Sequence, residues 1–174
     1  MLKVTNKKNK NITLRPWRLD DLDRLVQLAD NPKIAANLMD RFPHPYTRES
    51  GVNFIHMAMS SQPASVLAIT LDDELVGGIG VHPQADVYRK NMELGYWLAE
   101  EYWGKGIITE AIKLIVPYAF DNFDINRIYA RPFGGNIASQ KVLEKNGFHL
   151  EATLRGTFYK DGQYLDELIY GIRS

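Results

Sequence analysis

Residues 103–109 form a glycine turn, Trp-Gly-Lys-Gly-Ile-Ile-Thr, between a predicted strand and a predicted helix. The strand covers residues 92–99, and the helix over residues 107–120 carries an apolar stripe made of Ile108, Ala111, Ile112, Ile115 and Ala119. Glycine lets a ligand approach the backbone closely, and the start of a helix offers unpaired amides with a positive dipole end. This junction therefore predicts a sheet with flanking helices and a phosphate-binding turn.

Two nucleotide-binding patterns do not fit this turn. A Walker-type site needs a glycine five residues before Gly-Lys-Ser/Thr, whereas here Gly106 follows Lys105 and no glycine stands five residues before Gly104. A dinucleotide site needs a third glycine where Thr109 stands. A plain strand-to-helix turn without a ligand stays open, because glycine is common in turns.

The remaining periodicity predicts one domain over residues 1–174. Strands are predicted at residues 11–17, 65–71, 74–81 and 127–132, and helices at 19–30, 48–60 and 137–145, with one short helix between residues 31 and 47. Residues 148–172 read as two strands joined at Asp161-Gly162, a strong hairpin signal. The predicted fold class is α+β, a mixed sheet flanked by helices.

Composition excludes several classes of site. None of the 174 residues is cysteine, so disulfides, iron–sulfur clusters, thiolate metal ligands and cysteine nucleophiles are ruled out. The four histidines show no metal-ligand spacing, and we expect no metal. The 21 basic residues balance the 21 acidic ones, so no overall field attracts nucleic acid or a membrane. We recognise neither a signal peptide nor a membrane-spanning run, and expect a cytoplasmic location.

Two further motifs accompany the glycine turn. Residues 93–98 read Glu-Leu-Gly-Tyr-Trp-Leu, residues 136–139 read Asn-Ile-Ala-Ser, and residues 142–148 read Val-Leu-Glu-Lys-Asn-Gly-Phe. In this order and spacing, the motifs resemble the GNAT superfamily of N-acetyltransferases. Within it, the chain is most similar to the RimJ/RimL-like branch of ribosomal-protein N-terminal acetyltransferases. The resemblance covers essentially the whole chain and is densest over residues 92–148.

The resemblance implies the GNAT acyl-CoA N-acyltransferase fold, with a central mostly antiparallel sheet in which two parallel strands, 92–99 and 127–132, splay apart around acetyl-CoA. The pantetheine is expected to pair like a strand with backbone groups near Trp97 and Leu98. The pyrophosphate is expected on the amides of Gly104, Lys105, Gly106, Ile107, Ile108 and Thr109. Trp103 and Ile108 depart from the family pattern of Arg/Gln and Gly/Ala, so the amides must carry the binding, with Lys105 as an extra positive charge.

The helix at 137–145 contributes two further residues. By resemblance Asn136 and Ser139 are cofactor contacts, although Asn136 also fits a plain N-cap and Ser139 a solvent-facing hydroxyl. Family members use direct attack of an uncharged amine in a ternary complex, which suits a chain without cysteine. Ser139 is expected to protonate the leaving thiolate, because Leu143 occupies the place of a tyrosine acid that some members have. An amide near Leu98 is expected to stabilise the oxyanion.

Glu93 is the expected general base, acting directly or through water, because it lies on the cleft strand just before the cofactor contacts. The alternative is a cross-strand polar pair with a neighbouring lysine or arginine. No carboxylate occurs around residues 129–131, where many family members have their base. Tyr159, Tyr164 and Asp166 in the final hairpin either reach the amine or are surface residues.

The resulting hypothesis is an acetyl-CoA-dependent N-acetyltransferase that acts on a primary amine, either a protein N-terminus or a small molecule. Residues 31–60 and the final hairpin are expected to form the acceptor wall. A monomer and a homodimer both stay open. The alternative is a CoA-binding sensor or interaction module without turnover, because the second cleft strand lacks a carboxylate.

Overall fold

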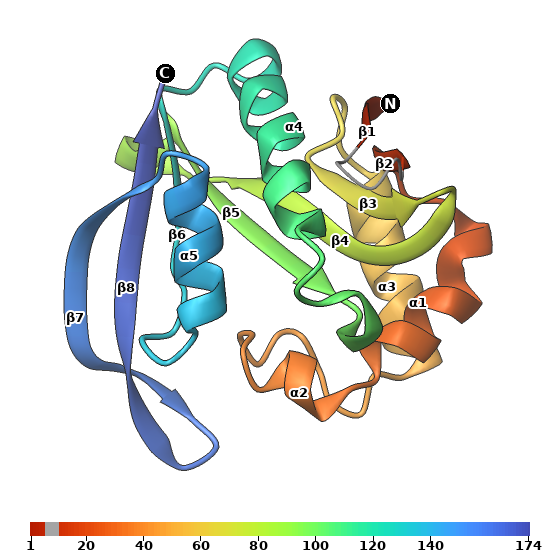
Figure 1. The fold of residues 1–174 in the computed structure, drawn as a ribbon, viewed down its shortest axis with the longest axis horizontal. Helices are drawn as coiled ribbons and strands as arrows, with labels where there is room; N and C mark the ends of the chain where they lie inside the picture. The colour runs from red at the N-terminus through yellow and green to blue at the C-terminus, as the bar shows by residue number, and fades with distance from the viewer. Residues whose placement is uncertain (6–10) are drawn as a thin grey trace.

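A computed structural model describes residues 1–5 and 11–174 and shows an eight-stranded sheet with helices on both faces (Figure 1). The strands lie in the order β1-β2-β3-β4-β5-β6-β8-β7. Neighbouring strands run antiparallel, apart from β5 and β6, which are parallel. This arrangement confirms the predicted fold class, a mostly antiparallel mixed sheet flanked by helices.

The strands are β1 (Leu2–Thr5), β2 (Asn11–Pro16), β3 (Val66–Leu71), β4 (Glu74–Pro83), β5 (Asn91–Leu98), β6 (Arg127–Ala130), β7 (His149–Lys160) and β8 (Gln163–Arg173). The α-helices are α1 (Leu22–Ala29), α2 (Pro32–Ala35), α3 (Arg48–Met59), α4 (Ile107–Asn122) and α5 (Ile137–Lys145). Three short 3-10 helices are η1 (Leu19–Asp21), η2 (Asp86–Tyr88) and η3 (Glu100–Tyr102).

Most of the predicted elements agree with these bounds within two or three residues, and two differ for a physical reason. β1 is not predicted, because residues 1–10 are polar and rich in lysine; the strand forms by pairing with β2. The strand predicted at 127–132 ends at Ala130, since Pro132 has no N–H group to donate to a neighbouring strand.

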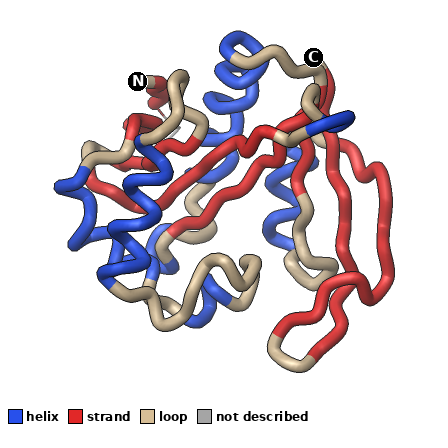
Figure 2. Tube along the Cα trace, turned by 180° about the vertical axis from the view of Figure 1, so that it is seen from behind, coloured by secondary structure: helices blue, strands red, loops and turns tan. Residues whose placement is uncertain are grey.

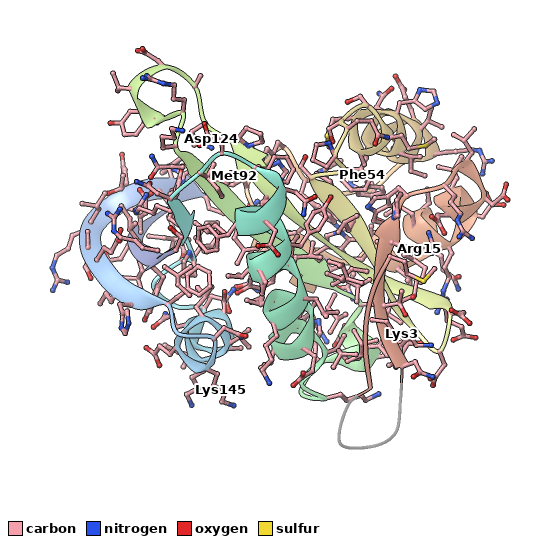
Figure 3. All side chains as sticks on the ribbon, turned by 90° about the horizontal axis from the view of Figure 1, so that it is seen from above. Lys3, Arg15, Phe54, Met92, Asp124 and Lys145 are labelled. Carbon is pink, nitrogen blue, oxygen red and sulfur yellow. The ribbon has the colours of Figure 1, made fainter. Side chains whose placement is uncertain are left out.

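Two hydrophobic clusters cover the two faces of the sheet. One contains Met92 and Leu98 of β5 with the buried sides of α4 and α5, and the other contains Trp97 with α1 and α3. Alternation along β5 sends neighbouring side chains to opposite faces. In Figure 3, Lys145 on α5 and Phe54 on α3 lie on opposite sides of the sheet.

β5 and β6 are paired only at their beginnings. The register joins Asn91 to Arg127, Met92 to Ile128 and Glu93 to Tyr129. Beyond Glu93, β5 continues to Leu98 without a partner on β6. Figures 1 and 2 show the two strands diverging toward the end of the molecule where α4 and α5 begin. We call this diverging region the splay.

Candidate functional site

The glycine turn leaves the beginning of α4 open. Gly104 and Gly106 have φ angles of 70° and 77°, in the left-handed region that favours glycine, and no atom lies within 4 Å of the position of a Cβ at either residue. Gly106 is the N-cap of α4, and no side-chain hydrogen bond caps this end. The amides of the first turn, Ile107 to Thr109, are therefore free to bind an anion.

The beginning of α5 is already satisfied. The Asn136 side-chain oxygen accepts a hydrogen bond from the Ser139 amide at 3.2 Å, which confirms the N-cap interpretation of Asn136. Of the two helices that start beside the splay, α4 therefore offers the open anion site.

Two side chains of the turn fold back onto the backbone. Lys105 Nζ donates to the Glu101 carbonyl at 2.6 Å and lies 5.2 Å from the centre of the Tyr102 ring. Trp103 Nε1 donates to the Leu98 carbonyl at 2.7 Å. The indole thus ties the turn to the end of β5, a role that the sequence does not indicate. The positive charge of Lys105 stays beside the turn without covering it.

The backbone of β5 faces the splay at alternate residues. The Ala99 amide donates to the Val76 carbonyl at 2.9 Å, so Ala99 faces β4, and the alternation of an antiparallel ladder turns Leu98 and Tyr96 the other way. With the Leu98 carbonyl bound to Trp103, the Leu98 amide and both backbone groups of Tyr96 have no strand partner among the described residues. We call these groups the open edge of β5.

The sequence-based expectation for Trp97 needs adjustment. Trp97 pairs with Gly78 of β4, so its backbone groups are not at the open edge. Its side chain packs in the cluster with α1 and α3. By this register, the backbone groups of Leu98 and Tyr96, but not those of Trp97, face the splay.

A hydrogen bond joins β5 to α5 on the face covered by α4 and α5. The hydroxyl groups of Tyr96 and Ser139 lie 2.7 Å apart. Burial raises the pKa of Tyr96 to about 12, and the hydrogen bond with Ser139 offsets this only in part. Ser139 is half-buried, and its hydroxyl faces β5. The sequence analysis missed Tyr96, although it stands within the Gly-Tyr-Trp motif.

Glu93 lies on the opposite face in an ion pair. Arg131 donates to both of its carboxylate oxygens, at 3.0 and 3.1 Å, and to Glu167 at 3.3 Å. Burial alone would lower the pKa of Arg131, but the hydrogen bonds that it donates to Glu93 and the two carboxylate charges raise it. The polar-pair interpretation of Glu93 is confirmed, and its role as a base stays a prediction. Glu167, on β8, was missed because only the folded chain brings it beside Arg131.

His82 faces Glu93 from β4 in the strand register. Burial, helped by the charge of Arg41, lowers the pKa of His82 below its usual value, while Glu93 acts in the opposite direction. The imidazole is therefore neutral near pH 7. The sequence analysis gave His82 no role, because its place beside Glu93 depends on the register of two strands.

The loop after α2 meets the final hairpin on this same side. Lys160 donates to Asp40 at 2.7 Å, and the rings of Phe133 and Phe158 lie 5.0 Å apart. A small pocket between them is lined by Met39, Asp40, Phe133, Phe158, Tyr159 and Lys160. Phe133 also forms a backbone bridge with Glu167, so the pocket adjoins the Arg131 ion pairs.

The candidates of the final hairpin are largely exposed or bound within the hairpin, although Tyr159 also lines the small pocket. Tyr159 and Tyr164 are 64% and 76% exposed and contact each other, with ring centres 5.1 Å apart. Asp166 accepts a hydrogen bond from the Gly156 amide at 2.9 Å. Across residues 1–5 and 11–174, no group of three or more acidic, histidine or cysteine side chains could hold a metal, and no helix is long and apolar enough to cross a membrane.

Comparison with known proteins identifies the class that this fold and site define. The profile of the family described as Acetyltransferase (GNAT) domain matches residues 11–149. The chain belongs to the GNAT family and is an acetyl-CoA-dependent N-acetyltransferase. Its relatives assign it to the RimJ/RimL-like branch.

Three relatives illustrate the similarity. The ribosomal N-acetyltransferase candidate YdaF of Bacillus subtilis (strain 168) is 31% identical over 97% of this chain and 94% of that protein. The structure of the microcin C7 self-immunity acetyltransferase MccE with acetyl-CoA and AMP has a TM-score of 0.80 and 26% identity, covering 94% of this chain and 92% of that one. The structure of the ribosomal L7/L12 α-N-protein acetyltransferase RimL with coenzyme A has a TM-score of 0.84, covering 99% and 98%; at 21% identity, it shows the fold alone.

The groups in the splay fit acetyl-CoA. The amides at the beginning of α4 suit a pyrophosphate, and the open edge of β5 suits the amide groups of a pantetheine arm. Both lie at the same end of β5, because Trp103 ties the turn to Leu98.

Proposed function

We propose that this enzyme transfers the acetyl group of acetyl-CoA to a primary amine by direct attack in a ternary complex within the single domain 1–174. The observation that carries this proposal is the open edge of β5, which leaves strand-pairing groups unused between the uncapped beginning of α4 and the Glu93 ion pair. A donor and an acceptor can meet there from opposite faces of the sheet.

The cofactor in this proposal is held mostly by backbone. Amides from Gly104 to Thr109 bind the pyrophosphate, and Lys105 adds charge from the side. The open edge of β5 pairs with the pantetheine, and the Leu98 amide faces the carbonyl oxygen of the thioester as negative charge develops on it. Asn136 and Ser139 close the other wall, since they begin α5.

The acceptor amine in this proposal loses its proton to Glu93, directly or through water. Arg131 fixes both carboxylate oxygens of Glu93, while Glu167 balances the charge of Arg131. Two carboxylates around one guanidinium leave a net negative charge, which attracts an ammonium. The alkyl part of the acceptor lies toward the pocket at Phe133 and Phe158.

The names of the relatives support a choice of acceptors to test. YdaF and RimL are named for ribosomal proteins, and RimL for the α-amine of L7/L12, whereas MccE is a self-immunity acetyltransferase. We therefore propose a protein N-terminal amine as the first acceptor to test and a small primary amine as the second.

The test follows thiol release from acetyl-CoA with N-terminal peptides of ribosomal proteins, polyamines and amino sugars. Acceptor-dependent release with one class identifies the acceptor. Tight binding of CoA without release for any acceptor would instead favour the sensor interpretation.

The Glu93→Gln variant tests the base. Turnover is expected to fall about 100-fold, the lower range for loss of a general base, with acetyl-CoA affinity nearly unchanged. Glu151→Gln is the matched control, because Glu151 also pairs with an arginine, Arg127 of β6, and lies outside the site. Unchanged turnover in Glu93→Gln would remove Glu93 as the base.

A further inference from the structure

The hydrogen bond between Tyr96 and Ser139 crosses from β5 to α5 beyond the last paired residues of β5 and β6. Among the described residues, Tyr96 is the one hydrogen-bond partner recorded for the Ser139 hydroxyl, and Ser139 is the one recorded for the Tyr96 hydroxyl. The two groups therefore determine each other's orientation.

The Ser139 hydroxyl can serve as donor or acceptor, and Tyr96 determines which. If Tyr96 donates, a lone pair of the Ser139 oxygen accepts this hydrogen bond. The Ser139 O–H then points away from Tyr96. The side chains of Leu94 and Leu98 flank Tyr96 on the same face of β5 and offer no competing polar group.

Tyr96 is poorly suited to give up its own proton. Burial raises the pKa of Tyr96 to about 12, so a proton transfer from Tyr96 would leave an unfavourable buried phenolate. A fixed donor, in contrast, stabilises negative charge on the oxygen that it faces.

We propose that Tyr96 is a positioning residue that donates to Ser139 and directs the Ser139 O–H toward the sulfur of the leaving group. This inference rests on the proposed role of Ser139 as the group that protonates the thiolate. When the amine attacks, the nitrogen–carbon bond forms and the electron pair of the carbon–sulfur bond goes to sulfur. Sulfur takes the Ser139 proton, and Tyr96 stabilises the charge left on Ser139. Of the two protons that the nitrogen loses, the one removed from the ammonium before attack passes through Glu93 to solvent. The one released from the nitrogen after attack returns to Ser139 through solvent.

A double-mutant cycle tests this inference, because it asks whether Tyr96 acts through Ser139. Ser139→Ala is expected to lower kcat about 100-fold. Tyr96→Phe removes one hydroxyl and is expected to lower kcat about tenfold, with the KM for acetyl-CoA unchanged. In the Ser139→Ala background, Tyr96→Phe is expected to have no further effect, and Ser139→Thr, which keeps a hydroxyl, is expected to restore the sensitivity to Tyr96→Phe.

Tyr118→Phe is the matched control. The Tyr118 hydroxyl also makes one hydrogen bond, to the Ala64 carbonyl at 2.8 Å, and lies on α4 outside the proposed machinery. Loss of the Tyr118 hydroxyl is expected to leave kcat unchanged. This result separates the effect of Tyr96→Phe from a general effect of removing a tyrosine hydroxyl.

Four results would overturn the inference. An equal loss from Tyr96→Phe in both backgrounds would show that Tyr96 acts independently of Ser139. An unchanged kcat in Tyr96→Phe, together with tighter binding of acetyl-CoA, would show that the cofactor has to break the hydrogen bond between Tyr96 and Ser139. A normal kcat in Ser139→Ala would remove the role of Ser139 and with it that of Tyr96, whereas a loss in Ser139→Ala with normal Tyr96→Phe would overturn the inference alone.

Discussion

The two faces of the splay present opposite kinds of chemistry. On the face covered by α4 and α5, the groups offered to a ligand are mainly backbone: the amides that begin α4 and the open edge of β5. On the other face they are charged side chains, Glu93, Arg131 and Glu167, with the pair Asp40–Lys160 at the rim. A site made of backbone groups tolerates side-chain departures from the family pattern such as Trp103 and Ile108. A site made of side chains changes its ligand preference when those side chains are substituted.

The largest expected effect comes from blocking the backbone site. Gly106→Leu places a side chain where a phosphate would approach the amides, and it forces φ of 77° on a residue with a Cβ. Because several charge-assisted hydrogen bonds are lost together, the dissociation constant of acetyl-CoA is expected to rise about a thousandfold. Isothermal titration calorimetry measures this directly.

Gly162→Leu separates the ligand effect from backbone strain. Gly162 has φ of 78° and equally open surroundings, but it lies in the tip of the final hairpin. The strain is thus matched, and acetyl-CoA binding is expected to stay normal. Equal losses of binding in both variants, or normal binding in Gly106→Leu, would contradict the backbone site.

The same contrast explains what the sequence could predict. The glycine turn, the Asn136 cap and helix α5 are local features, because turn, cap and helical stripe each lie within a few consecutive residues. The residues of the proposed acceptor face come from β5, from the segment directly after β6 and from β8, so their proximity depends on sheet order and register. Glu167 and His82 therefore had no signal in the sequence.

Local motifs also left the donor side incomplete. The expectation of Trp97 at the cofactor followed the motif but not the parity of the ladder, which depends on the pairing of Ala99 with Val76. Tyr96 also has no local signal, because its hydrogen-bond partner Ser139 lies 43 residues away in the chain. The fold class, in contrast, followed from the order of strands and helices alone.

Alkaline pH is expected to lower the folding stability through one buried tyrosine on each face. The two contributions are similar, and the effect is intermediate among those predicted. Burial raises the pKa of Tyr96, against α5, and of Tyr46, in the cluster with α1 and α3, to about 12. Below pH 10 both are neutral in the folded and unfolded chain. Between pH 10 and 12 the unfolded chain ionises first, so each tyrosine is expected to cost about 2–3 kcal/mol of stability by pH 12.

Denaturant unfolding from pH 9 to 12 measures this loss, and the phenolate absorbance of the folded enzyme reports the tyrosines directly. Tyr96→Phe is expected to abolish the contribution of Tyr96. A phenolate signal from the folded protein that is complete near pH 10 would show that neither ring is held in its neutral form.

The smallest expected effect concerns the rim of the acceptor face. Asp40 is exposed, whereas the Lys160 side chain is largely buried against the pocket at Phe133 and Phe158. Exposed ion pairs contribute little, so Asp40→Asn is expected to raise the KM for the acceptor about threefold and to leave the KM for acetyl-CoA unchanged. Asp124→Asn, which breaks the exposed pair with Lys90 elsewhere on the surface, is the control.

Steady-state kinetics in low and high salt check the result, because the difference between Asp40→Asn and the parent enzyme is expected to shrink as salt screens the pair. A rise in the KM for acetyl-CoA instead would mean that the two faces of the splay are coupled through the hairpin and that the division into a backbone site and a side-chain site does not hold at the rim.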